Sequence, residues 1–363
     1  MSGEWDAMRE PLSAWLLERM EGARRVEVGE LDAHGSGYSA ETIVVPLRVT
    51  RGTETHEERV VLRKEVDEPA VYPQQAVGLD VEVEIQYRAM DALHRASKLP
   101  LAPLIGFEGD PAVLGTPFFV MGFVEGDVPV LDPAYTNEGF FFDASPEQRH
   151  RMIRTGLETL ADFHHVPWRE AGFEWLVTPG TTPGTFAQIE LWAAFGEREL
   201  RGRVHPIFEA GVTHLRAHLP DPEAELAKLC VSWGDARPGN IIWQDFTPAC
   251  LTDFENIAIG PPELDLGWWL MFDRTCHEVL SAPRLEGEPT RDQQRDLYYE
   301  AAGKDLGDMH YWEVLAAMRY CAIVARVMNR YEERGLLPAD HTVWRNNPPT
   351  TVLAGLLEMD PDA

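Results

Sequence analysis

The chain has 363 residues, of which 44% are hydrophobic and 10% aromatic, so it can bury a large core and is long enough for two domains or lobes. Its formal net charge is −28, from 60 acidic and 32 basic side chains, which disfavours nucleic-acid binding through a basic face. The same charge fits two other interpretations, a solubilising surface or the attraction of a cationic substrate.

Cysteine spacing and the N-terminal stretch indicate a protein of the reducing cytosol. Residues 1–20 are charged and lack the apolar core, about 7–15 residues long, of a signal peptide. No segment approaches the roughly 18 apolar residues of a membrane span. We therefore expect a soluble, cytoplasmic protein with neither membrane nor nucleic-acid partner. Wide spacing and the lack of a CxxC pair disfavour disulfides and a zinc site at Cys230, Cys250, Cys276 and Cys321.

The first part of the chain predicts a helix followed by three strands. Apolar side chains recur at helical spacing over residues 4–22, where Pro11 either breaks the helix or marks its true start. Apolar runs then predict strands at residues 25–31, 42–50 and 58–64.

Two features of these strands bear on binding. The third strand ends in Arg63 and Lys64, and because successive strand residues point to opposite faces, only one of the two can face a ligand. The joint between the first two strands contains a Gly-x-Gly that is on its own more often an ordinary turn. The glycines and serines of this joint are Gly35, Ser36, Gly37 and Ser39.

A helix and a buried strand complete this part. Residues 79–96 carry apolar side chains down one side, which predicts a helix with Gln86 and Glu82 on one face. Residues 117–126 form an apolar run that ends in glycine, as a core strand would.

The remaining chain is mainly helical in pattern. Ser145 before Pro146, with Gln148 at the third helical position, predicts a helix start, and this helix should end at His164 and His165. Both histidines suit capping or core packing at a helix C-terminus better than catalysis. Further helices are expected over residues 185–219, divided before Pro206, and over residues 311–330 and 351–359.

Residues 231–269 carry the most informative pattern. Asp235 is followed by Arg237 and Asn240, and Asp253 comes thirteen residues after Asn240. Short apolar runs adjoin both acidic segments, as expected for a two-stranded hairpin with a loop at each end. Phosphoryl transfer needs a carboxylate that orients or deprotonates the attacking hydroxyl, and hard oxygen ligands that hold Mg²⁺ against nucleotide phosphates. This ordered set supplies one base and two such ligands.

The stretch resembles the aminoglycoside phosphotransferase and choline kinase family, small-molecule kinases with a protein-kinase-like fold. The family pattern G-D-x-R-x-G-N, then a D-W/F-E turn, then G-x-P-x-x-D-L-G, is matched by residues 234–240, 253–255 and 260–267. Within the family the chain is most similar to the bacterial branch related to kinase-like domains fused to some acyl-CoA dehydrogenases. The last motif should start a helix in which Asp265 is structural rather than chemical.

This resemblance implies a bilobal α+β fold. The N-terminal lobe, residues 1–124, would bind nucleotide on a five-stranded antiparallel sheet, and a hinge at about residues 120–126 would connect it to a mainly helical lobe at 125–363. The C-terminal lobe would hold the catalytic loop, the metal site and the acceptor site.

The resemblance also implies roles for individual residues. Asp235 would orient and partly deprotonate the acceptor hydroxyl, and Arg237 would neutralise charge on the γ-phosphoryl group of ATP. Asn240 and Asp253 would bind Mg²⁺. ATP would be bound by the loop between the first two strands, by a strand arginine and by backbone groups of the hinge: Gly35, Ser36, Gly37, Ser39, Arg63, Met121, Gly122 and Val124.

One position departs from the family pattern. Where the kinase helix carries a glutamate that pairs with the strand lysine, this chain has Gln86. Either Glu82 or Glu84 substitutes for it, or the pairing with Arg63 is loose. The departure weakly favours a pseudokinase, a binding module without turnover, whereas the intact catalytic motif argues for an enzyme.

The acceptor is the least determined part. Members of the family use aminoglycosides, choline-like amines, macrolides or, in the dehydrogenase-linked branch, 4-hydroxyacyl-CoA. An aminoglycoside site needs several carboxylates, and the chain end offers Glu358, Asp360 and Asp362, although a terminal segment more often forms a solvated tail. Trp344 and Arg345 offer an aromatic ring and a guanidinium instead.

Charges beyond about 10 Å from a site are largely screened, so the net charge says little about the pocket. We therefore expect Mg²⁺-dependent transfer of the ATP γ-phosphate to the hydroxyl of a non-aminoglycoside acceptor, such as a hydroxyacyl-CoA or another hydroxylated metabolite. An aminoglycoside or other antibiotic is the alternative acceptor.

Overall fold

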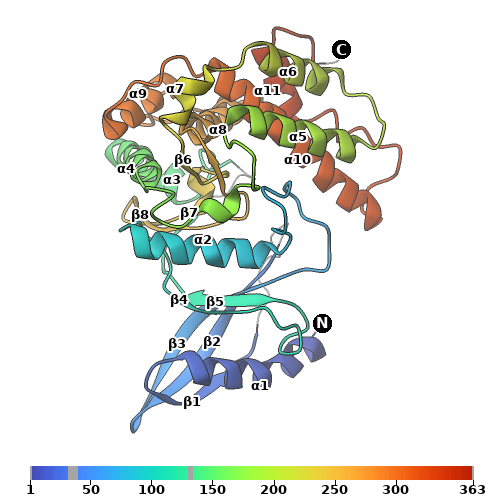
Figure 1. The fold of residues 1–363 in the computed structure, drawn as a ribbon. Helices are drawn as coiled ribbons and strands as arrows, with labels where there is room; N and C mark the ends of the chain where they lie inside the picture. The colour runs from blue at the N-terminus through green and yellow to red at the C-terminus, as the bar shows by residue number, and fades with distance from the viewer. Residues whose placement is uncertain (1, 32–39, 130–133, 362–363) are drawn as a thin grey trace.

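Five antiparallel strands form the sheet of the N-terminal lobe, in the order β1-β2-β3-β5-β4. The computed structural model describes residues 2–31, 40–129 and 134–361. In the ribbon view this sheet lies at one end of the molecule together with α1, and most of the other helices gather at the opposite end (Figure 1). The predicted five-stranded antiparallel sheet and helical lobe are confirmed. The strands are Ala23–Val28 (β1), Glu41–Arg51 (β2), Glu54–Lys64 (β3), Leu104–Glu108 (β4) and Phe118–Gly122 (β5).

Each face of this sheet packs against a different helix. Phe118 and Val120 of β5 are buried in a small core that includes side chains of α1 (Ser2–Arg19), whereas Phe119 belongs to the large core that α2 (Glu82–Ala96) shares with the helical lobe. Side chains alternate across a strand, so β5 contributes to both cores. Helix α1 continues through Pro11 without ending or starting there. Pro11 is exposed, and because it has no amide hydrogen, the helical hydrogen bond to the carbonyl of Ala7 is not made.

The alternation on β3 decides which basic residue faces the helical lobe. Leu62 is buried in the core with α1, so Arg63 points to the opposite face, toward α2. Lys64 lies 3.7 Å from the carboxylate of Glu41.

The helical lobe contains the predicted long helices. The capping box at Ser145 is confirmed, because the Ser145 hydroxyl accepts from the Gln148 amide and the Gln148 side chain accepts from the Ser145 amide. The division before Pro206 is also confirmed. The helices are Phe140–Asp143 (α3), Pro146–His164 (α4), Thr185–Leu200 (α5), Pro206–Ala217 (α6), Pro222–Leu226 (α7), Glu263–Arg274 (α8), Arg291–Ala302 (α9), His310–Glu333 (α10) and Pro348–Leu356 (α11).

Two short antiparallel pairs of strands carry the motif region. Cys230–Ser232 (β6) pairs with Ala258–Gly260 (β9), and Ile241–Gln244 (β7) pairs with Thr247–Leu251 (β8), which is the predicted hairpin. A short 3₁₀ turn, Pro238–Asn240, precedes β7. The chain therefore places Asp235 and Asp253 shortly after β6 and β8, and next to Ala236 and Phe254 of the large core.

Residues 65–81, which we call the strap, leave β3, reach the helical lobe and return to α2 (Figure 1). Arginines of α10 hold it. Arg326 donates to the carbonyls of Pro69 and Ala70, and Arg330 donates to the carbonyl of Pro69 and lies 3.0 Å from the carboxylate of Glu68. The strap thus connects the two lobes beside the motif region.

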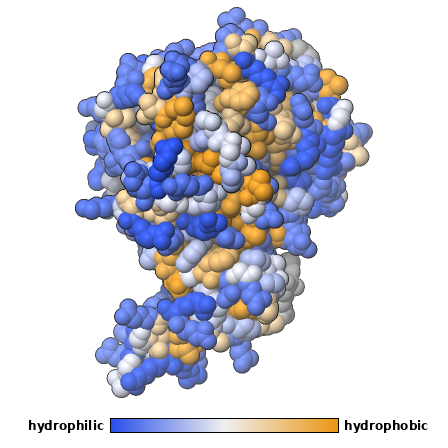
Figure 2. Space-filling model, viewed as in Figure 1, coloured by the Kyte–Doolittle hydropathy of each residue, from blue (hydrophilic) through white to orange (hydrophobic). Residues whose placement is uncertain are grey.

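Hydrophilic side chains cover most of the visible face, with smaller hydrophobic areas on the helical lobe and where the lobes meet (Figure 2). All four cysteines are buried and free. None of the helices in the described ranges combines the length and the apolar character needed to cross a bilayer.

Candidate active site

The backbone that leads to Asp235 is held by the buried carboxylate of Asp265 on α8. Asp265 accepts hydrogen bonds from the amides of Trp233 (2.7 Å) and Gly234 (2.8 Å). It also accepts from the Ser232 hydroxyl at 2.9 Å and contacts His164 Nε2 at 2.9 Å. Burial would raise the pKa of Asp265, but the hydrogen bonds from His164 and the two amides hold it below its ordinary value. Asp265 and His164 are therefore structural, as the sequence predicts.

Gly234 is required by its backbone. Its φ is +90°, and a Cβ there would lie 2.0 Å from the carbonyl oxygen of Asn256. The carbonyl of Gly234 accepts from Asn256 Nδ2 at 3.0 Å and from Arg319 Nη2 at 2.8 Å. Burial lowers the pKa of Arg319 to about 10, so this guanidinium still carries its charge at neutral pH. Only glycine can adopt a φ of +90° while its backbone lies this close to the carbonyl of Asn256.

Three donors fix the carboxylate of Asp235. Its Oδ1 accepts from Trp268 Nε1 at 2.7 Å and from Arg237 Nε at 3.1 Å, and its Oδ2 accepts from Asn240 Nδ2 at 2.7 Å. Burial would lower the pKa of the Arg237 guanidinium, but the nearby Asp235 raises it above its usual value. The structure thus brings three residues of the predicted motif into direct contact.

Asn240 and Asp253 lie close together because Thr252, the neighbour of Asp253, donates to the backbone carbonyl of Asn240 from its amide (3.0 Å) and its hydroxyl (2.9 Å). Asp253 has a φ of +65°, in the left-handed region that glycine adopts freely and that asparagine and aspartate adopt more often than other side chains. Its Oδ1 is buried and accepts no hydrogen bond within the described residues. Burial raises the pKa of Asp253.

These side chains suit a hard cation. A buried carboxylate oxygen that accepts no hydrogen bond is costly unless positive charge lies near it, and Asp253 Oδ1 has Arg63 at 3.6 Å and room for a cation in the cavity. The side-chain nitrogen of Asn240 donates to Asp235, so the side-chain oxygen of Asn240 points away from that bond and can serve as a second ligand, a neutral one, beside Asp253. Carboxylate and amide oxygens are the donor set that Mg²⁺ prefers.

Arg63 reaches the same place from β3. Its Nη2 lies 3.6 Å from Asp253 Oδ1 and donates to Gln86 Oε1 at 3.2 Å, and its Nη1 donates to Thr42 Oγ1 at 2.7 Å. Of the two alternatives left open by the sequence, the structure favours a direct contact between Arg63 and Gln86. Glu84 pairs with Arg88 on the surface, and Oε1 of the buried Glu82 has no hydrogen-bond partner within the described residues.

The predicted nucleotide loop, with Gly35, Ser36, Gly37 and Ser39, lies outside the described residues. At the predicted hinge, Met121 and Gly122 belong to β5, and the Gly122 amide donates to the carbonyl of Pro103 at 2.8 Å. That amide is therefore engaged within the protein. Val124 follows β5 and has no backbone hydrogen bond to another described residue.

A cavity of about 300 Å³ opens beside these residues. Its lining combines the charged side chains of the motif with side chains of α8, α10 and the strap. Its lining consists of Arg63, Val71, Tyr72, Asp235, Arg237, Asp253, Glu255, Trp268, Phe272, Tyr320, Ile323, Val324, Val327 and Met328.

Sequence reasoning missed Tyr72, Trp268 and Arg319 as parts of this site. Trp268 stands next to the predicted Gly260–Gly267 motif, but nothing in that pattern shows that its indole reaches Asp235. Tyr72 lies in the irregular strap, and Arg319 occurs in a helix whose other side chains are mainly apolar. Each of the three meets the site through a contact between segments far apart in the chain.

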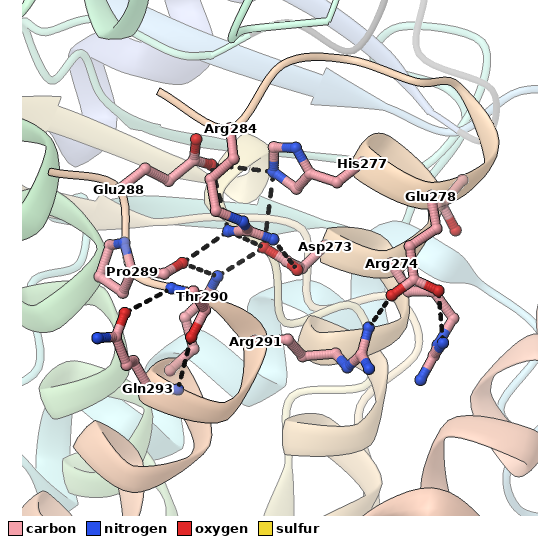
Figure 3. Close-up of polar contacts among 12 residues, drawn as sticks. Asp273, Arg274, His277, Glu278, Arg284, Glu288, Pro289, Thr290, Arg291 and Gln293 are labelled. Carbon is pink, nitrogen blue, oxygen red and sulfur yellow. Dashed lines mark hydrogen bonds and ion pairs between the residues drawn. The ribbon is translucent and has the colours of Figure 1, made fainter. Parts of the chain in front are cut away.

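A second polar cluster lies at the end of α8. In the described part of the chain, one group of possible metal ligands has its ligand atoms within 4.8 Å of one another. It consists of Asp273, His277 and Glu288. Arg284 fills the centre of this group and donates to both oxygens of Asp273, at 3.1 and 2.7 Å (Figure 3). Its guanidinium supplies the positive charge that a cation would bring, so the cluster is an ion-pair network.

Comparison with known proteins identifies the family of the chain. The model of the phosphotransferase enzyme family matches residues 36–283. The chain is 28% identical over 295 residues to the Arabidopsis thaliana protein "Probable acyl-CoA dehydrogenase IBR3". The matched region covers 79% of this chain and 32% of that protein. The chain therefore spans about a third of this relative.

Solved structures share the fold. A candidate aminoglycoside phosphotransferase from Ralstonia eutropha superposes with a TM-score of 0.69 at 22% identity, covering 96% of this chain and 97% of the other. Choline kinase from Cryptosporidium parvum superposes with a TM-score of 0.56 at 11% identity, covering 91% of this chain and 88% of that one.

Removing the charge of Asp265 should destabilise the fold. In Asp265→Asn an amide group would face donors that now meet a carboxylate, so we expect the free energy of unfolding to fall by about 2–4 kcal/mol. Urea denaturation measures this change. Asp292→Asn, at an exposed position of α9, is the control and should change it little. Equal stability of the two variants would show that Asp265 does not hold the loop.

His277 should stabilise the fold in a pH-dependent way. Burial would lower its pKa, but the contacts with Glu288 and Asp273 raise it above the ordinary value. A group whose pKa is raised in the folded state stabilises the fold fully below its unfolded pKa, about 6.5 for histidine, and this stabilisation is lost as the pH rises through the folded-state pKa. The substitution His277→Gln should therefore lower the free energy of unfolding by about 1–2 kcal/mol more at pH 6 than at pH 9.

Urea denaturation at the two pH values tests this, with the exposed His150→Gln as control. A loss for His277→Gln that is independent of pH would contradict the charged state of His277.

Proposed function

Because the chain belongs to the phosphotransferase enzyme family, we propose that it is a Mg²⁺-dependent kinase that transfers the γ-phosphate of ATP to the hydroxyl of a small-molecule alcohol. The contact set of Asp235 is the observation that carries this proposal. Its carboxylate is fixed by Trp268, Arg237 and Asn240 and opens onto a cavity that also contains Asp253.

The proposed reaction balances as follows. The acceptor oxygen attacks the γ-phosphorus of ATP, and the bond between that phosphorus and the β–γ bridging oxygen breaks, so ADP leaves with the electron pair. The proton of the acceptor hydroxyl passes to Asp235 and then to solvent. Since the carboxylate is already oriented, little rearrangement is needed when the hydroxyl arrives.

Three further side chains would meet the phosphates. Arg237, held against Asp235, would place its guanidinium at the γ-phosphoryl group, and Arg63 would contact the other phosphates. Asn240 and Asp253 would hold Mg²⁺, which when bound would neutralise charge on the nucleotide phosphates. The glycine and serine loop at residues 35–39 and the backbone of Val124 are proposed contacts of the nucleotide.

Two alternatives lead to different measurements. An antibiotic phosphotransferase would release ADP with aminoglycosides, whereas a pseudokinase would bind nucleotide without turnover. Against the pseudokinase stands the position of Arg63, which retains a charged partner in Asp253 even though Gln86 replaces the family glutamate. We propose a non-aminoglycoside acceptor, with a hydroxyacyl-CoA among the candidates.

Replacing the proposed base should abolish turnover selectively. Asp235→Ala should lower kcat by roughly 10²–10⁴-fold and leave ATP affinity within a few-fold, because the carboxylate acts on the reacting hydroxyl in the transition state. ADP release and nucleotide titration measure the two quantities. Asp143→Ala, exposed at the end of α3, is the control. Retained turnover, or an equal loss of ATP binding, would count against Asp235 as the base.

The metal ligand can be tested on one hairpin. Asp253→Asn should raise the Mg²⁺ concentration needed for ATP binding, because a neutral oxygen replaces an anionic one. Asp245→Asn makes the same change at the exposed turn between β7 and β8 and should leave the Mg²⁺ dependence unchanged. If both variants behave like the unmodified protein, Asp253 is not a ligand.

A further inference from the structure

The cavity beside Asp235 has an apolar wall. Ile323 and Val327 of α10 face it together with Val324 and Met328, at the three- and four-residue spacing that places side chains on one side of a helix. Trp268 and Phe272 of α8 form the adjoining wall. An acceptor whose hydroxyl reaches Asp235 must therefore lay the rest of its skeleton against hydrocarbon and aromatic surfaces.

The carboxylates that line this cavity are already engaged. Asp235 receives three hydrogen bonds, and Asp253 faces Arg63 and the proposed metal. Glu255 is buried and lies 3.5 Å from Gln86 Nε2. Within the described residues that line the cavity, α10 contributes no carboxylate. Several converging carboxylates, which a polyamine would need, are not found at this wall.

The acidic and aromatic side chains near the chain end lie elsewhere. Glu358 and Asp360 are not among the residues that line the cavity. Trp344, another candidate from the sequence, packs against His205 and Arg203 instead. The described part of the C-terminal segment therefore supplies neither an ammonium site nor an aromatic wall to the cavity.

The strap closes the cavity from the side of the sheet lobe. Val71 and Tyr72 line it, next to the carbonyls of Pro69 and Ala70 that the α10 arginines hold. The Tyr72 hydroxyl has no hydrogen-bond partner among the described residues, so it is the polar group of this wall that remains available to a ligand.

From this arrangement we infer that the cavity is the acceptor site, and that it takes an alcohol whose carbon skeleton is apolar and carries no ammonium group. The skeleton lies against α8 and α10, and Tyr72 covers it from the strap. This inference rests on the proposed function and adds the chemical class of the acceptor.

Turnover should follow the length of the apolar chain. With MgATP and the straight-chain alcohols ethanol, butan-1-ol, hexan-1-ol and octan-1-ol, kcat/KM should rise about threefold to fourfold per added methylene until the cavity is full. Kanamycin and choline should be poorer acceptors than hexan-1-ol. ADP release measures turnover, and calorimetry measures the affinity for hexan-1-ol in the presence of MgADP.

One variant tests the wall itself. Val327→Asp places a carboxylate in the cavity and should abolish the dependence of both turnover and binding on chain length. Leu336→Asp makes a similar change at an exposed residue outside the cavity lining and should preserve that dependence. The chain-length series on the unmodified protein is informative even if Val327→Asp fails to fold.

The outcomes separate the acceptor class from the reaction. Turnover that is independent of chain length, or that favours kanamycin or choline, would overturn the inference and leave the proposed phosphotransferase intact. Chain-length-dependent binding with no ADP release would support the apolar site and contradict the proposed reaction. If the protein neither turns over nor binds the alcohols, the inference is overturned.

Discussion

The position of Asp235 depends on one buried carboxylate, that of Asp265. Asp265 accepts hydrogen bonds from two consecutive amides just before Asp235, so the loop cannot move without leaving those amides and the carboxylate unsatisfied in the core. Its contact with His164 connects the loop to α4 as well. Gly234 completes the constraint because its left-handed backbone brings the chain against Asn256.

The same centre receives parts from both lobes. Arg63 comes from the sheet and lies near Asp253 of the helical lobe, while the strap carries Tyr72 to the cavity. Arg326 and Arg330 of α10 hold that strap by its backbone carbonyls, and other side chains of the same helix form the apolar wall. Helix α10 therefore both connects the lobes and shapes the site, so the geometry of the acceptor cavity depends on the packing of the two lobes.

The acidic surface and the cavity have different chemistry. The net charge of −28 is spread over the whole chain, and exposed charges beyond about 10 Å are screened by salt. Near Asp235 the carboxylates are few and already paired or facing the proposed metal, and the side chains that α8 and α10 add to the cavity lining are mainly apolar or aromatic. The bulk charge is therefore a poor guide to the acceptor, whereas the side chains on α8 and α10 bear on it directly.

The sequence by itself determined the family, the two-lobed fold and the order of the motif, because local periodicity and the short spacing from Asp235 to Asp253 are properties of neighbouring residues. It also favoured Arg63 over Lys64, an orientation that the alternation along β3 then produced. It placed Gln86 at the position that faces Arg63 but left their pairing open, and it did not predict the roles of Tyr72, Trp268 and Arg319. Those side chains meet across wide separations in the chain, so only the packing of helices, sheet and strap decides which of them face the same cavity.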